Sequence, residues 1–187
     1  MEKKCAKEID LGFLLDDTPS WKLEGRFFPS KLGGKPAWLA VGKPPSLDQL
    51  SCGGCKKPMT FLLQIYAPIE AVENDQENVD TFHRSLFVFL CKSASCTEGN
   101  LAVFRSQLAR KNSYYPFEPS DEDDRKPVPG TRLSDRMATC WLCGLPTDGK
   151  KCGACKVASY CSPEHQKLDW RGGHKAKCGD EKEPGPS

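Results

Sequence analysis

The chain has 187 residues and a formal net charge of +2, so no overall excess of charge directs it to nucleic acid or to acidic membranes. No apolar run approaches the ~20 residues of a membrane-spanning helix, and the mostly charged residues 1–10 argue against a signal peptide. The eleven cysteines therefore favour metal binding in a reducing compartment over disulfides, and we expect the protein in cytoplasm and nucleus.

The N-terminal half predicts a sheet. Residues 11–15 form a short apolar run that suggests an edge strand, and residues 59–67, 84–91 and 101–104 are rich in aliphatic and aromatic side chains that favour three more strands. Within residues 27–39, a Gly-Gly pair is followed by a proline and a tryptophan, which predicts a loop with an aromatic anchor. The pattern of a phosphate-binding loop is missing there, so a structural loop is the preferred interpretation.

Two cysteine pairs flank the predicted strands. They are Cys52-x2-Cys55 and Cys91-x4-Cys96. The first pair precedes the strand at 59–67, and the second ends the strand at 84–91. If these strands pair antiparallel, the four thiols come together at one end of the sheet. We therefore predict a structural zinc site, with buried apolar cysteines as the alternative. Cys5 is left as a free thiol.

Charge is uneven along the rest of this half. Residues 70–80 carry five acids and no base, which predicts an exposed acidic loop. Residues 105–117 mix basic and aromatic side chains; such a mixture can bind nucleic acid by phosphate contacts and stacking, but a strand or turn with a solvated face is the commoner origin. Acids and prolines in residues 118–139 predict an unpacked linker.

Eight candidate metal ligands then follow in four pairs. They are Cys140-x2-Cys143, Cys152-x2-Cys155, Cys161-x3-His165 and His174-x3-Cys178. Zinc takes four thiolate or imidazole ligands in a tetrahedron, so eight ligands predict two sites without an open position for water. Such sites build structure and do no Lewis-acid chemistry. Disulfides or buried thiols are the alternative.

Local signals agree with a metal-held segment. Ser162 is a good N-cap and Pro163 suits the first helical position, so a helix should begin there, and the glycine pair 172–173 should end it. Gly144 and Gly153 each follow a ligand cysteine, where we expect positive φ. A core this small cannot fold alone, so zinc should supply on the order of 10 kcal/mol of folding free energy per ion.

The ligand order, the stretch Tyr160-Cys161-Ser162 and the pair Asp169-Trp170 resemble a MYND-type zinc finger. The resemblance implies interleaved pairing. One zinc takes Cys140, Cys143, Cys161 and His165, and the other takes Cys152, Cys155, His174 and Cys178. His165 stands where many such fingers have cysteine, and either residue can ligate zinc. Some of these fingers bind proline-containing peptides in an apolar groove. The candidate peptide contacts here are Trp170, Gln166 and Tyr160, although Trp170 could equally be packing against the zinc core.

Further motifs, in the same order, resemble the programmed cell death protein 2 family. They are Leu11-Gly12-Phe13, Phe28-Pro29-Ser30-Lys31, Gly33-Gly34-Lys35-Pro36-Ala37-Trp38-Leu39, Phe61-Leu62-Leu63-Gln64, Phe82-His83-Arg84-x-Leu86-Phe87-Val88-Phe89 and Val103-Phe104-Arg105. The family continues beyond the finger, so a fragment or short form is expected. The resemblance implies a role in ribosome biogenesis, as a dedicated chaperone that captures a newly made small-subunit ribosomal protein. An acidic loop beside apolar sheet surface would suit a basic client.

The resulting prediction is a small, zinc-rich α+β protein. A β-rich N-terminal domain (1–117) held by a zinc knuckle is followed by a linker (118–139), a MYND-type finger with two zincs and short helices (140–178) and a disordered tail (179–187). We expect a monomeric, non-enzymatic interaction factor with protein partners and no direct nucleic-acid or membrane contact, because hydrolase, P-loop and zinc-protease motifs are missing. The alternatives are a nuclear corepressor adaptor that recruits proline-containing peptides and a nucleic-acid-binding zinc protein.

Overall fold

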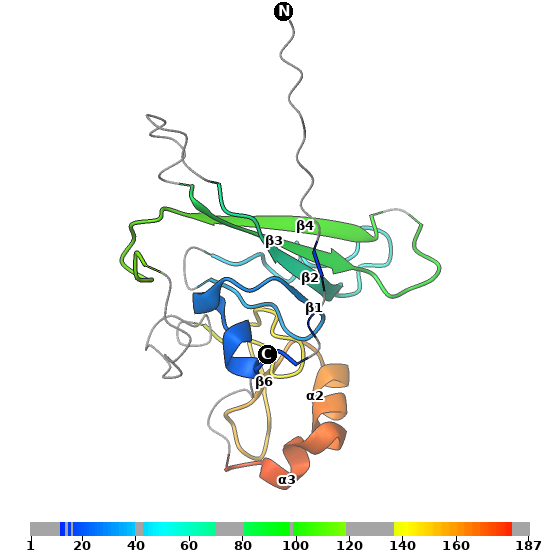
Figure 1. Ribbon diagram of the computed structural model, residues 1–187. Coiled ribbons are helices and arrows are strands. Elements are labelled where there is room, and N and C mark those ends of the chain that lie inside the picture. Colours follow the sequence, from blue (N-terminus) through cyan, green and yellow to red (C-terminus); the bar gives the residue numbers. More distant parts are fainter. Residues whose placement is uncertain are drawn as a thin grey trace, which may run out of the picture.

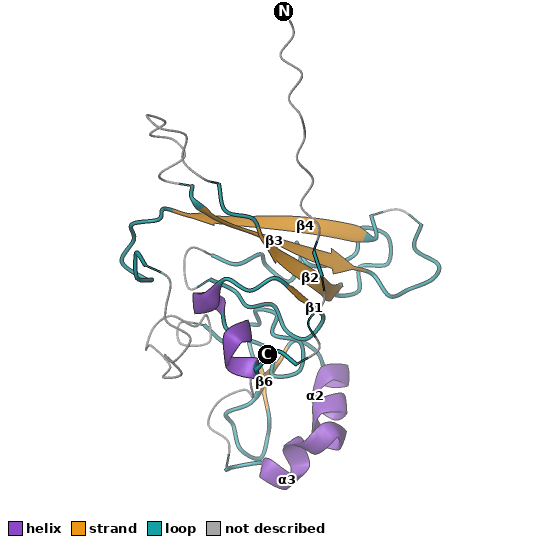
Figure 2. Cartoon of the chain, in the orientation of Figure 1, coloured by secondary structure: helices purple, strands orange, loops and turns teal. Residues whose placement is uncertain are grey.

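The structure is a computed structural model that describes residues 12–13, 15, 17–39, 43–69, 81–97, 99–118 and 137–180. The strands of its main sheet gather at one end of the molecule, and helices α2 (Pro163–Asp169) and α3 (Lys175–Lys177) lie at the other (Figures 1 and 2). A four-stranded antiparallel sheet has the spatial order β1-β2-β3-β4. Its strands are β1 (Lys31–Leu32), β2 (Thr60–Tyr66), β3 (His83–Leu90) and β4 (Leu101–Leu108). Two 3-10 turns, η1 (Ser20–Leu23) and η2 (Gly25–Phe27), precede the sheet.

Three of the four predicted strands form close to their expected positions, and β4 runs four residues further than predicted, to Leu108. The predicted edge strand at 11–15 is wrong for the residues that are described there. Phe13 and Leu15 belong to no strand and are 85% and 81% exposed. The edge is formed instead by β1, because the N–H of Gly33 donates to the carbonyl of Leu62 and the N–H of Tyr66 donates to the hydroxyl of Ser30.

One face of the sheet packs into the main core. The side chains of β3 alternate between buried and half-buried, as expected for a sheet covered on one side. Phe87 and Phe89 lie with Trp38 and Phe61 in this core. The buried Gln64 accepts the N–H of Ala37 at 2.8 Å and donates to the carbonyl of Pro29 at 2.8 Å. These two bonds hold the predicted aromatic loop against β2.

The finger contains two short strands and a broken helix. The strands are β5 (Lys150–Lys151) and β6 (Ser159–Tyr160), and the helical parts are α2 (Pro163–Asp169), the π-helical turn η4 (Trp170–His174) and α3 (Lys175–Lys177). Ser162 caps α2 as predicted, accepting the N–H of His165. The chain continues through η4, where Gly173 adopts a φ of 145° and makes the kink. None of the described helices has the length and apolar character to cross a bilayer.

The finger docks on the sheet domain. The indole N–H of Trp38 donates to the buried carbonyl of Gly144 at 3.0 Å, and Leu145 joins the core beneath the sheet. Gly144 has a φ of 70°, and a Cβ added there would lie 2.8 Å from the Cβ of Lys35. The positive φ favours a glycine here, and the close approach to Lys35 requires one. Cys5, the predicted acidic loop 70–80, most of the predicted linker and residues 181–187 of the predicted tail lie outside the described residues.

Candidate metal centres

The structure brings twelve cysteine and histidine side chains together in three groups of four, with the ligand atoms of each group within 4.8 Å of one another. The first group is Cys52, Cys55, Cys91 and Cys96; the second is Cys140, Cys143, Cys161 and His165; the third is Cys152, Cys155, His174 and Cys178. These are the three sets predicted from the sequence, with the interleaved pairing that the family resemblance implied for the finger.

The spacing of the ligand atoms fits zinc. A tetrahedron with Zn–S bonds of about 2.3 Å has S···S edges of about 3.8 Å. The Sγ atoms of Cys55 and Cys91 are 3.6 Å apart, and those of Cys143 and Cys161 are 3.7 Å apart. In the third group the Sγ–Nε2 distance from Cys155 to His174 is 3.7 Å. All three groups are therefore compatible with zinc and offer it four protein ligands each, which makes them structural sites.

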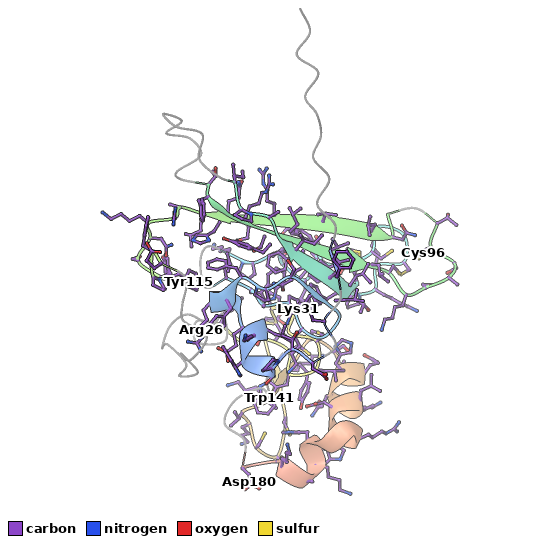
Figure 3. All side chains as sticks on the ribbon, in the orientation of Figure 1. Arg26, Lys31, Cys96, Tyr115, Trp141 and Asp180 are labelled. Atoms are coloured by element: carbon purple, nitrogen blue, oxygen red, sulfur yellow. The ribbon has the colours of Figure 1, made fainter. Side chains whose placement is uncertain are left out.

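Strand pairing builds the first group. β2 and β3 run antiparallel with Thr60 opposite Leu90, so the residues before β2 lie beside those after β3. The N–H of Gly53 donates to the carbonyl of Gly99, and this bond ties the first cysteine turn to the loop between β3 and β4. Cys96 lies in that loop, at the end of the sheet (Figure 3). A metal bound to these four cysteines would therefore join the segment before β2 to the segment after β3 at this end of the sheet.

The three Cys-x2-Cys turns share one backbone geometry. The residue after the second cysteine has positive φ each time: 59° at Lys56, 70° at Gly144 and 57° at Lys156. Its N–H donates to the carbonyl of the first cysteine, at 3.0, 2.8 and 2.9 Å respectively. The prediction of positive φ is thus right for Gly144 and wrong for Gly153, which occupies the position after the first cysteine. Comparing the three motifs in register would have located the strained position.

Backbone N–H groups in these turns favour the metal-binding thiolate form. The N–H of Cys55 is the largest influence on Cys52 and, with that of Gly54, lowers the pKa of its thiol to about 7 against the opposing effect of burial. Burial also opposes ionisation of Cys152, yet the N–H of Cys155 and the side chain of His174 lower the pKa of that thiol to about 6. Thiolates are the species that ligate zinc, so Cys52 and Cys152 are suited to hold the metal.

A shell of aromatic rings fixes His174. The rings of Trp141, Tyr160 and Trp170 lie 5.6, 6.3 and 5.7 Å from its ring, all edge-on, and His174 is buried. The Tyr160 hydroxyl donates to the carboxylate of Asp169 at 2.7 Å; burial and this carboxylate raise the pKa of Tyr160. The sequence offered no sign of this role for Trp141 except its position between Cys140 and Cys143.

The predicted peptide contacts separate into two kinds. Trp170 and Gln166 line an open groove of about 550 Å³ on the finger, together with Pro163, Lys167 and Arg171. Tyr160 is only 1% exposed, so its side chain belongs to the buried cluster of the finger and has no surface to offer a peptide. The sequence stretch that contains Tyr160 therefore marks the zinc core of the finger.

His83, unassigned by the sequence, is buried at the start of β3. Its Nδ1 is 2.8 Å from the hydroxyl of Tyr66, and the ring of Phe28 stacks on it at 4.1 Å. Burial, followed by the charge of Arg110, lowers the pKa of His83. A neutral core histidine is the consistent interpretation.

Comparisons with known proteins agree with these features. Residues 8–122 match the family model described as the N-terminal domain of programmed cell death protein 2, and residues 140–178 match the MYND finger. Programmed cell death protein 2 of Bos taurus is 42% identical over 181 residues, which is 95% of this chain and 50% of the bovine protein. The Mus musculus protein of the same name is 43% identical over 175 residues, 91% of this chain and 48% of that protein. The chain spans about half the length of these relatives. No solved structure matches it.

Proposed function

The chain belongs to the programmed cell death protein 2 family, and we propose that it is a non-enzymatic chaperone that holds a newly made ribosomal protein of the small subunit in cytoplasm and nucleus. The zinc-binding, protein-interaction part of this role follows from the finger and its family. The choice of client comes from the family resemblance and is supported by the outer face of the sheet.

That face is aliphatic. In register across the four strands, the side chains of Leu32, Leu63, Val88 and Val103 form one row, and those of Ile65 and Leu86 form the next, ending at Arg105. Leu32, Ile65, Leu101 and Val103 are 57%, 45%, 59% and 56% exposed. The opposite face carries the core, and the finger and the 3-10 turns lie together on that side (Figures 1 and 2).

An antiparallel sheet that meets water on one side normally carries polar residues there. A contiguous apolar face is instead a mark of an interaction surface. A ribosomal protein has apolar surface destined for burial in the ribosome and basic segments destined for RNA, so it needs both to be covered before assembly. The segment that joins β2 to β3 carries five acids and no base, which would suit the basic part of such a client.

A single charge on this face is expected to weaken client capture. Val103→Glu places a carboxylate in the middle of β4, where an apolar partner would bury it unpaired; capture should fall at least tenfold, which corresponds to about 1.4 kcal/mol. The measurement is recovery of small-subunit ribosomal protein and its own mRNA with the tagged chain from translating eukaryotic extract.

Gln107→Glu is the matched control, because it adds the same charge to the same face of the same strand, at its polar end opposite Arg84. Equal capture by both variants would remove the sheet face from the mechanism. Wild-type chain that recovers no ribosomal protein would contradict the proposed client.

The groove of the finger favours a second candidate, an adaptor that recruits proline-containing peptides. Trp170→Ala removes the largest side chain lining the groove, and we expect at least tenfold weaker binding of a proline-rich peptide by calorimetry. Leu168→Ala is the control, since Leu168 is exposed on α2 and does not line the groove. Zinc content should be unchanged in both variants. If Trp170→Ala and Leu168→Ala bind alike, Trp170 serves only as packing for His174.

A further inference from the structure

The outer edge of β4 is unpaired within the described part of the chain. In an antiparallel pair, alternate residues bond to a given neighbour. The N–H of Cys91 donates to the carbonyl of Asn100, and the register of β3 and β4 extends this pattern, so even-numbered residues of β4 bond to β3. The odd-numbered residues 101, 103, 105 and 107 therefore direct their N–H and C=O groups away from the sheet.

This edge lacks the usual protection. Exposed edges are commonly blocked by proline, bulges, several charges or very short strands. β4 has eight residues, no proline and one charged side chain, Arg105. Its pairing with β3 is regular from Leu101 to Leu108. Such an edge is a template for another strand.

A pocket of about 410 Å³ opens beside the middle of this edge. Its apolar lining includes the rings of Trp38, Phe87 and Phe104 and the prolines Pro44 and Pro45. Phe104 projects from β4 toward the core face. Because side chains alternate along a strand, a strand added at this edge would place every second side chain on the core side, level with Phe104. One of those side chains would enter the pocket.

The lining also sets the charge of the occupant. Lys43 lines the pocket, whereas Arg105 touches it from a strand position whose side chain belongs to the outer face; none of the described residues that line the pocket is acidic. Lys43 is exposed to solvent. A carboxylate two positions from the inserted apolar side chain, on the same side of the added strand, would be attracted, and a basic residue there would be repelled.

We propose that the edge of β4 binds an extended segment of a partner protein as a fifth strand. The segment places one bulky apolar side chain in the pocket and, two positions along on the same side of the strand, an acidic residue beside Lys43. This partner differs in charge from the basic client proposed above and uses backbone groups and a pocket on the core side, so the two proposals stand independently.

The test uses two synthetic peptides of about nine residues with alternating valine and threonine around a central leucine. In one peptide glutamates stand two residues before and two residues after the leucine, on the same side of the strand, and in the other peptide lysines stand there. We expect the wild-type chain to bind the glutamate peptide at least tenfold more tightly by fluorescence anisotropy. Binding should slow hydrogen exchange at the outward N–H groups of Val103 and Arg105, a signature that binding to the aliphatic face alone would not give.

Lys43→Glu should reverse the preference between the two peptides, and it leaves the core untouched because Lys43 is exposed. Arg105→Pro removes one outward N–H without breaking a bond to β3 and should abolish binding of both peptides, whereas Arg105→Gln keeps that N–H and should leave the preference between the peptides unchanged. Absent binding, unchanged exchange along β4, or an unaltered preference in Lys43→Glu would overturn the proposal. Since Val103→Glu tests client capture separately, either proposal can fail alone.

Discussion

Chelation of zinc is expected to unfold the finger and to open the end of the sheet, lowering the free energy of unfolding by on the order of 10 kcal/mol for each ion removed. The reason is the composition of the core. Of the five buried residues at the centre of the finger, Cys140 and Cys152 are themselves ligands. Without metal, the remaining apolar burial cannot offset the chain entropy of ordering the finger. Elemental mass spectrometry should find three zinc ions per molecule of the purified chain.

Single ligand variants separate the sites. Cys178→Ser should leave two tightly bound ions and weaken the near-ultraviolet circular dichroism of the aromatic rings around His174. Cys96→Ser should also leave two ions but loosen the loop between β3 and β4, with the finger signal intact. Ser95→Ala serves as the control in the same loop, because Ser95 is exposed and its hydroxyl lies 2.9 Å from that of Ser93. A wild-type chain with two ions, unchanged by Cys96→Ser, would show that the N-terminal cysteines are buried thiols.

The sequence predicted the metal chemistry well because ligand spacing is local and zinc imposes few geometries. The α+β fold class, the zinc cofactor and the family are confirmed. Even the N-terminal group, whose pairs are 36 residues apart between Cys55 and Cys91, followed from one step of reasoning about antiparallel strands. That step worked because strand ends, once paired, leave the cysteines little freedom.

What the sequence could not predict depends on contacts between distant residues. The edge strand β1 has only two residues and no periodic pattern, so its position is fixed by the bonds at Ser30 and Gly33. The apolar run at 11–15 looked more like a strand but has no partner that would make it one among the described residues. The docking of the finger includes a hydrogen bond between an indole and a carbonyl 106 residues apart, which hydrophobic patterning does not encode.

Trp38→Ala is expected to lower the free energy of unfolding by about 3–5 kcal/mol and to uncouple the finger from the sheet. Trp38 is 8% exposed and lies against Phe87 and Phe89, with ring centroids 4.6 and 5.9 Å away. Its indole N–H also satisfies the carbonyl of Gly144 across the junction. Truncation therefore leaves a cavity on the sheet side and an unpaired carbonyl on the finger side. Calorimetry should show one transition for the wild type and two for the variant.

Trp38→Phe isolates the hydrogen bond, because the ring still fills most of the space but cannot donate to Gly144. Leaving a buried carbonyl unpaired costs about 1–3 kcal/mol, so this variant should fall between wild type and Trp38→Ala. Trp21→Ala is the control for loss of an indole elsewhere. Trp21 packs on Phe27, and no residue of its 3-10 turn η1 is buried. All three variants should keep three zinc ions, because no ligand is touched. If Trp38→Ala unfolds in a single transition and is as stable as Trp21→Ala, the sheet and the finger are held together by other contacts.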